Sequence, residues 1–284
     1  MDVSKLKAGD NHYMAYVGPP TQYDFMGATQ FRLLSTLGLR ANHSLLDFGC
    51  GSLRAGRLFL TYLDEGAYFG IEPNKWLIED AIKNQIGKDL ATLKKPHFDH
   101  NGDFKTDVFS QQFDFIIAQS IFSHTGSDLI TTALSNFKES LKPNGLIAAT
   151  FIEGITDFDG RGWVYPGCVN YRSSTIRRFA EEAGCFVIRI PWYHPRQTWY
   201  VFSKEKHRLP NKAMLRHLSG AVLFEQEFDE SWKRSKKIMH LFKSYLKQLL
   251  PRPIKNGLKK FCLLYTSDAA DDTPCVDLGG RRII

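Results

Sequence analysis

Hydrophobic and polar positions follow two different rhythms over residues 26–203. Short runs of consecutive apolar residues are typical of buried strands, whereas apolar residues three or four positions apart are typical of a helix with one buried face. Stretches of the two kinds alternate along the chain. The predicted strands cover 44–48, 67–72, 113–118, 146–151, 185–191 and 198–203, and the predicted helices cover 25–37, 54–62, 75–86, 129–141 and 173–183.

This alternation predicts the fold class. Right-handed strand–helix–strand units build a mainly parallel sheet with helices on both faces. With a further strand before residues 101–104, we expect an α/β, doubly wound, Rossmann-like sheet of seven strands. A short link joins the last two strands, which should therefore form an antiparallel hairpin. Ligands of such sheets bind where the parallel strands end, so reactive residues are expected directly after each strand.

The chain divides into four predicted parts. Residues 1–25 are polar and contain a Gly-Pro-Pro sequence, which predicts an irregular N-terminal arm. Residues 26–203 hold the alternating pattern and form the predicted domain, and 204–261 form a basic helical extension. Residues 262–284 resemble a read-through translation of the transposon adapter used in preparing sequencing libraries. We interpret them as an artefactual tail, with a genuine acidic tail as the alternative.

Charge matters here more by its distribution than by its net value of +7. Residues 1–203 hold 20 Lys and Arg against 21 Asp and Glu, whereas 204–260 hold 15 basic and 5 acidic residues. A nucleic-acid-binding enzyme usually spreads its basic residues over the active-site face, so we do not expect nucleic acid as a partner. Residues 231–250 have the pattern of a basic amphipathic helix. Such a helix contacts an anionic membrane surface or a partner protein, or packs on its own domain.

The composition sets the class of protein. Hydrophobic residues make up 43% and charged residues 24% of the chain, which is ordinary for a soluble globular protein. No apolar run approaches the roughly 18–20 residues of a membrane-spanning helix, and the N-terminus lacks the apolar stretch of a signal peptide. The five cysteines show neither a CxxC pair nor a zinc-binding spacing. We therefore expect a cytoplasmic protein with reduced thiols and no metal site.

The first strand is followed by a glycine turn with chemistry on both sides. Gly49 and Gly51 let the backbone approach a ligand closely, and the next helix presents its N-terminal amides. Glu72 ends the second strand, where a carboxylate can accept both hydroxyls of a ribose, as in dinucleotide enzymes. Two features oppose a dinucleotide. Arg54 stands where the third glycine of GxGxxG is expected, and Asp47 would repel a diphosphate but suit a cationic ligand.

Four motifs in order resemble class I S-adenosylmethionine-dependent methyltransferases. Residues 47–51 (DFGCG) are similar to their first motif, and 70–73 (GIEP) to their second. Residues 113–120 (FDFIIAQS) are similar to their fourth-strand motif, and 141–146 (LKPNGL) to the turn that leads into the fifth strand. The likeness covers about residues 26–203 and is greatest to uncharacterised bacterial enzymes of the small-molecule type. It implies S-adenosyl-L-methionine as cofactor.

The resemblance also implies roles by position. The amides around Gly49 and Gly51 would pack beside the methionyl part of the cofactor, with Asp47 attracting its amino group. Glu72 would hold the ribose. Asp103 would accept the adenine amino group, with Phe104 against the ring or packed in the core. The residues expected near the methionyl carboxylate and the sulfonium are Gln119, Ser120 and Arg54.

Candidates for catalysis and acceptor binding follow the later strands. His124 lies just past the fourth strand, where an imidazole can deprotonate a hydroxyl; a structural histidine is the alternative. His194 and Arg196 lie in the link of the final hairpin and line a substrate mouth or a solvated turn. Residues 153–172, with Trp163 and Tyr165, are long and aromatic for a connection. They form a lid or acceptor platform, or a surface loop.

Three functions are compatible with these residues. The first is methyl transfer to an O or N atom of a small-molecule or sugar-like acceptor. The second is an NAD- or nucleotide-binding oxidoreductase on a similar sheet, which the absence of a third glycine opposes. The third is a catalytically silent cofactor-binding fold that acts through its basic helix as an interaction module. The sequence favours the first.

Overall fold

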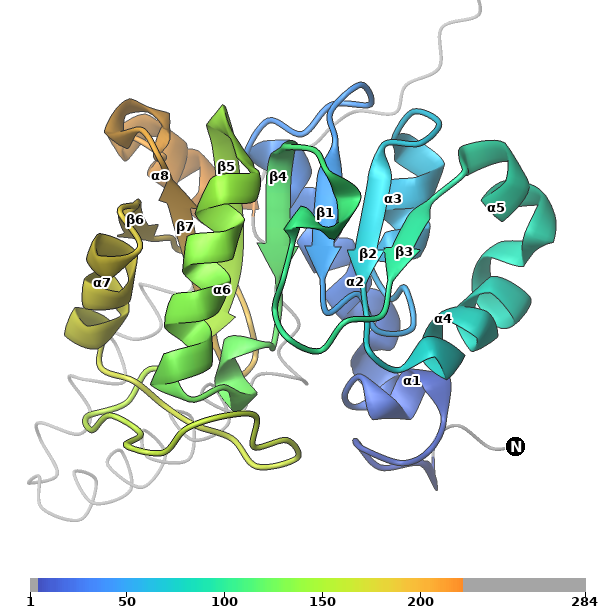
Figure 1. Ribbon diagram of the computed structural model, residues 1–284, viewed down its shortest axis with the longest axis horizontal. Helices are drawn as coiled ribbons and strands as arrows, with labels where there is room; N and C mark the ends of the chain where they lie inside the picture. Colours follow the sequence, from blue (N-terminus) through green and yellow to red (C-terminus); the bar gives the residue numbers. More distant parts are fainter. Residues whose placement is uncertain (1–4, 222–284) are drawn as a thin grey trace, which may run out of the picture. The chain divides into compact units, whose positions relative to one another are not determined.

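The computed structural model describes residues 5–221 (Figure 1). The predicted helix 231–250, most of the basic extension and the tail 262–284 lie outside the described residues. Within the described part, no helix is both long enough and apolar enough to cross a membrane.

One sheet of seven strands runs through the domain in the order β3-β2-β1-β4-β5-β7-β6 (Figure 1). The first five strands pair in parallel, and β7 pairs antiparallel with both β5 and β6. The predicted doubly wound sheet with a terminal antiparallel hairpin is therefore confirmed. The strands are β1 (Leu45–Phe48), β2 (Tyr68–Ile71), β3 (His97–Asp99), β4 (Phe113–Ala118), β5 (Leu141–Phe151), β6 (Phe186–Arg189) and β7 (Thr198–Ser203).

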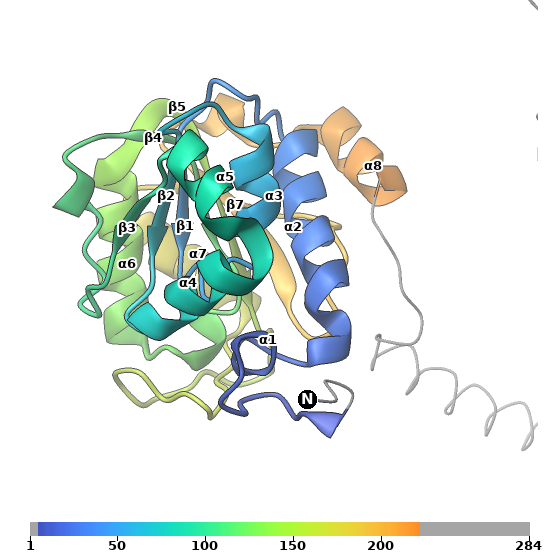
Figure 2. The same cartoon turned by 90° about the vertical axis from the view of Figure 1, so that its right-hand side faces the viewer.

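Helices cover both faces of the sheet, as Figures 1 and 2 show. α6 and α7 pack on one face, while α2, α3, α4 and α8 pack on the other. The α-helices are α1 (Tyr13–Tyr16), α2 (Tyr23–Thr36), α3 (Gly56–Tyr62), α4 (Lys75–Ala81), α5 (Gly87–Lys94), α6 (Ser127–Ser140), α7 (Ser173–Glu182) and α8 (Lys212–Ala221).

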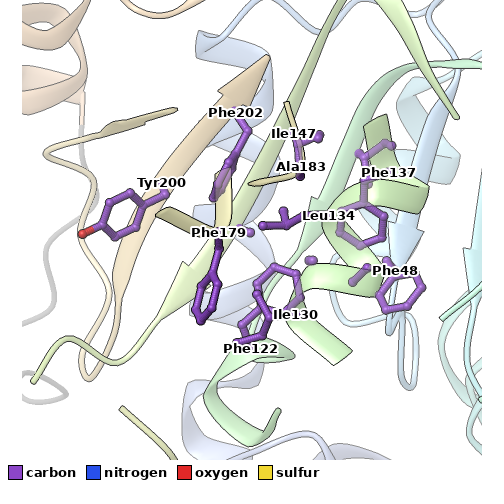
Figure 3. Packing of buried hydrophobic residues seen from close by; sticks show 14 of the residues in the cluster. Phe48, Phe122, Ile130, Leu134, Phe137, Ile147, Phe179, Ala183, Tyr200 and Phe202 are labelled. Atoms are coloured by element: carbon purple, nitrogen blue, oxygen red, sulfur yellow. The ribbon is translucent and has the colours of Figure 1, made fainter. Parts of the chain in front are cut away.

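Alternate residues of each central strand feed the two hydrophobic cores. Along β7, Tyr200 and Phe202 enter the core under α6 and α7, whereas Trp199 and Val201 enter the core on the other face. Successive side chains of a strand point to opposite faces, so a strand buried on both sides is apolar throughout. Figure 3 shows Leu134 and Phe137 of α6, Phe179 of α7 and Phe202 of β7 within this cluster.

The largest departures from the predicted bounds occur at three places. The helix predicted for 75–86 continues as a π-helical turn, Ile82–Ile86, and then as α5. Strand β5 begins at Leu141 instead of residue 146, with a register shift against β4 in its first part. The N-terminal arm contains α1 and a 3₁₀ turn, Pro20–Gln22. In Figure 1 the arm lies at the edge where the parallel strands end, beside the loop that follows β5.

Candidate active site

A cavity of about 790 Å³ lies where β1, β2 and β4 end. The turn after each of these strands lines it, which is the position expected for the ligand of a doubly wound sheet. Two further segments complete its walls, residues 16–19 of the arm and 163–168 of the loop after β5. The arm and the loop meet, since Tyr165 Oη donates a 3.1 Å hydrogen bond to the Tyr16 carbonyl.

The glycine turn after β1 has the conformation that its sequence predicts. Gly49 and Gly51 have φ of +73° and +54°, in the left-handed region that favours glycine. A Cβ on Gly49 would collide with Ile121, and one on Gly51 would lie 2.6 Å from Val17 Cγ1. Neither position can therefore carry a side chain without displacing another wall of the cavity.

Asp47 is a buried carboxylate at the base of the cavity. Its Oδ2 accepts a 2.8 Å hydrogen bond from Tyr68 Oη. Burial raises the pKa of Asp47 to about 7, although the Tyr68 hydrogen bond and the charge of Arg54 oppose the rise. A carboxyl group in this state is poised to lose its proton when a cation arrives beside it.

Glu72 is held in place from both oxygens. Oε2 accepts a 3.1 Å hydrogen bond from the Gly51 amide, and Oε1 accepts bonds of 2.9 and 2.8 Å from the Asn74 amide and side chain. Burial raises the pKa of Glu72, and these donors oppose the rise. The carboxylate is thus fixed at the cavity wall, and one lone pair of Oε2 is left over because each oxygen carries two.

Arg54 is a largely buried cation whose charge acts on Asp47. One nitrogen donates a 2.8 Å hydrogen bond to the Val17 carbonyl and another donates to Gln119 Oε1, while Nε has no partner. Burial lowers the pKa of Arg54 to about 10. A guanidinium that has lost its water and still has an unpaired donor favours an anion beside it.

Gln119 and Ser120 follow β4, and their side chains connect Arg54 to the link of the final hairpin. Ser120 has φ of +62°, which is uncommon for a residue with a side chain. Gln119 contacts Gln30 of α2 at 3.1 Å and His194 at 2.9 Å. His194 is buried, and its Nδ1 accepts hydrogen bonds from the Arg196 and Gln197 amides.

This environment makes His194 a neutral, positioning side chain. Burial first, and the charges of Arg196 and Arg54 second, hold the pKa of His194 well below its ordinary value. Arg196 remains exposed and lines the cavity. Of the two candidates in this link, only Arg196 therefore faces the space where a ligand would lie.

His124 lines the cavity on the side away from Glu72, in the 3₁₀ turn Phe122–His124 after β4. Its Nδ1 lies 2.6 Å from the Gly167 carbonyl oxygen. Because a carbonyl only accepts, Nδ1 carries the proton and Nε2 keeps a free lone pair. Burial lowers the pKa of His124 below its ordinary value. The imidazole is therefore neutral at pH 7, which is the state required of a general base.

Phe104 and Asp103 point in opposite directions. Phe104 is buried, lines the cavity and packs 5.4 Å from Phe48 between ring centroids. Asp103 does not line the cavity, and its carboxylate pairs with Lys105 Nζ at 2.8 Å on the surface. The adenine-binding role expected of Asp103 has no support in this position, whereas the neighbouring Asn101 does line the cavity.

Sequence reasoning missed the arm residues of the cavity wall and the buried Gln30. Gln30 lies on the buried face of α2, where its polar side chain interrupts the apolar pattern. A glutamine on an apolar helix face was the one available signal for this residue. A buried amide needs a hydrogen-bond partner, which here is Gln119. Residues 16–19 gave no signal, since their contacts with the loop after β5 join parts of the chain far apart in sequence.

Comparison with known proteins fits this geometry. Residues 46–147 match the family described as a methyltransferase domain. No curated protein matches the chain. A magnesium protoporphyrin IX methyltransferase from Synechocystis PCC 6803, solved with bound SAM, aligns at 13% identity and a TM-score of 0.50 over 70% of this chain and 88% of its own. The glycopeptide N-methyltransferase MtfA aligns at 11% identity and a TM-score of 0.50 over 63% and 90%.

At these identities the two structures support the fold alone. The family match covers the glycine turn, Glu72 and the turn after β4, which all line the cavity. With the strand order and the turn geometry, it decides between a methyltransferase and a dinucleotide oxidoreductase. The chain therefore contains a methyltransferase domain on the doubly wound sheet, with S-adenosylmethionine as its cofactor.

Proposed function

We propose that this enzyme methylates an O or N atom of a small-molecule acceptor, with His124 as the general base. The observation that carries the proposal is the division of one cavity into two chemically different sides. Asp47, Glu72 and Arg54 supply buried charges on one side, and His124 supplies a neutral imidazole on the other. S-adenosylmethionine, when bound, supplies a sulfonium methyl group that an acceptor atom can take, with the bonding electron pair left on sulfur.

The charged side fits the cofactor group by group. Arg54, with its unpaired Nε, suits the methionyl carboxylate, and Asp47 suits the ammonium group. Glu72, fixed by three donors, can accept from a ribose hydroxyl at its remaining Oε2 lone pair. Gln119 and Ser120 lie between these groups and the acceptor side, and Phe104 offers a ring face for the adenine.

His124 has the geometry that a base needs. With Nδ1–H bonded to Gly167, Nε2 can take the proton of an acceptor hydroxyl or amine as the methyl group is transferred. The cavity volume of about 790 Å³ is in the range of small-molecule sites, which favours a small molecule over a macromolecule. The exposed Arg196 at its wall is suited to an anionic substituent on the acceptor.

The test is transfer of a labelled methyl group from S-adenosylmethionine to a panel of hydroxyl and amine acceptors. His124→Ala should lower kcat by about 10²–10⁴-fold while affinity for S-adenosylhomocysteine stays nearly intact. His207→Ala is the matched control, because His207 is exposed and outside the cavity. A His124→Ala enzyme that melts earlier but keeps its kcat would remove the base and leave alignment as the catalytic device.

A further inference from the structure

Trp163 is a large apolar side chain that the fold leaves uncovered. Its exposed fraction is 49%, and of the exposed large hydrophobic residues in the described part of the chain, it is the one that lines the cavity. An exposed aromatic ring inside a cavity commonly contacts a ligand. Its ring centroid lies 5.7 Å from that of His124 and 6.4 Å from that of Phe104.

The main chain fixes Trp163 relative to the proposed base. The Val164 amide donates a 2.9 Å hydrogen bond to the His124 carbonyl, and the Gly126 amide donates a 2.8 Å bond to the Gly162 carbonyl. The His124 side chain adds its bond to Gly167 in the same loop. Three hydrogen bonds therefore tie the segment that carries Trp163 to the segment that carries His124, so the main chain holds the two residues side by side.

The rings of Trp163 and Tyr165 are nearly parallel to each other, and the His124 ring is steeply inclined to both. Trp163 and Tyr165 are nearly parallel, 21° apart with centroids separated by 6.3 Å. The His124 ring is inclined by 59° to Trp163 and 77° to Tyr165. A planar ligand stacked parallel to Trp163 would present its edge, where a ring substituent lies, to the imidazole.

The charges around Trp163 favour a neutral acceptor over a cationic one. Among the described residues that line the cavity, the carboxylates are Asp47 and Glu72, and both already bond to protein donors on the cofactor side. A cationic amine stacked on Trp163 would therefore have no carboxylate of the cavity wall left to pair with, and Asp128 next to this segment already accepts a 3.0 Å hydrogen bond from the Gly162 amide. A neutral hydroxyl needs none, because a neutral imidazole can take its proton.

We propose that Trp163 is the acceptor platform and that the acceptor is a planar aromatic hydroxyl compound, stacked on the indole with its hydroxyl toward His124. This rests on the proposed function and names the substrate class of the same site. Aromatic pairs in offset stacking gain energy beyond the burial of area. A saturated analogue of the same size loses that contribution and fits a flat face poorly.

The test measures binding rather than turnover, on the full chain saturated with S-adenosylhomocysteine. The probes are 2-naphthol and its saturated counterpart decahydro-2-naphthol, titrated by calorimetry. The wild type should bind 2-naphthol about ten-fold more tightly than the saturated alcohol. Trp163→Ala should abolish that preference, and Trp163→Phe should retain most of it. Ile155→Ala is the control, because Ile155 is 91% exposed in the same loop and does not line the cavity.

Three outcomes would overturn the inference. The first is equal binding of the two alcohols by the wild type, including no binding of either. The second is 2-naphthol binding that Trp163→Ala leaves unchanged, and the third is tighter Trp163-dependent binding of tetramethylammonium than of 2-naphthol. If Trp163→Ala weakens S-adenosylhomocysteine instead, the indole belongs to the cofactor side. Failure of the wild type to bind S-adenosylhomocysteine would instead contradict the proposed function, so the two failures are distinguishable.

Discussion

The raised pKa of Asp47 makes cofactor binding depend on pH. If Asp47 holds the ammonium group of the cofactor, only its ionised form is competent to do so. In the free enzyme burial raises the pKa of Asp47 to about 7. About a tenth of the carboxyl groups are then ionised at pH 6 and about nine tenths at pH 8.

The size and sign of the effect follow from that pKa. The apparent Kd equals the intrinsic Kd divided by the competent fraction, so S-adenosylhomocysteine should bind about ten-fold more tightly at pH 8 than at pH 6. The bound ammonium favours the ionised carboxylate, so the pKa of Asp47 falls on binding and a proton is released. Near pH 7 the release should be about half a proton per site.

Calorimetry in buffers of different ionisation enthalpy measures both quantities. Asp47→Asn should bind more weakly and lose most of the pH dependence and the proton release. Tyr68→Phe removes the hydrogen bond that lowers the pKa of Asp47, so that pKa should rise and the pH dependence of binding should move to higher pH. Asp89→Asn, an exposed acid of α5, is the control. Wild-type binding that is flat from pH 6 to pH 8, with no proton released, would refute the assignment of Asp47 to the ammonium group.

Two further predictions concern the buried cation and the buried histidine. Arg54→Gln should weaken S-adenosylhomocysteine about ten-fold or more, because a charged hydrogen bond contributes about 1.5–3 kcal/mol. It should leave 5′-methylthioadenosine, which lacks the amino-acid carboxylate, unaffected, and equal losses for both ligands would exclude the carboxylate role. For His194, the unfolded chain binds more protons below its ordinary pKa than the folded chain does. The free energy of unfolding should therefore fall as pH drops through about 6.5, with a slope of at most about 1.4 kcal/mol per pH unit from this group. His194→Asn should flatten that slope in urea titrations, and an unchanged slope would show that other groups set it.

The parts of the fold that were predictable depend on neighbours in sequence. The strand Phe113–Ala118 and the strand Thr198–Ser203 have their predicted bounds, because an apolar run buried on both faces is visible in one short window. The turn at Gly49 and Gly51 was predictable for a similar reason, since left-handed backbone and close approach select glycine locally. The place of Glu72 in the cavity wall was predictable because it directly follows a predicted buried strand.

The remainder depends on contacts between distant residues. Phe104 adopts φ of +64°, which no pattern in the sequence announces, and Asp103 before it pairs with Lys105 at the surface. His194 is buried because two amides of its own turn donate to it, a geometry that spacing alone does not give. The arm and the loop after β5 meet at the cavity through the hydrogen bond from Tyr165 to Tyr16, which are 149 positions apart in the sequence.

The charged side of the cavity is the centre of this account, and titration with S-adenosylhomocysteine and NAD tests it most directly. The full chain should bind S-adenosylhomocysteine in the micromolar range and give no heat with NAD. Glu72→Ala should weaken S-adenosylhomocysteine about ten-fold or more, whereas Glu79→Ala, an exposed acid of α4, should not. Unchanged affinity in Glu72→Ala, or NAD binding of similar strength, would contradict the assignment of this cavity to S-adenosylmethionine.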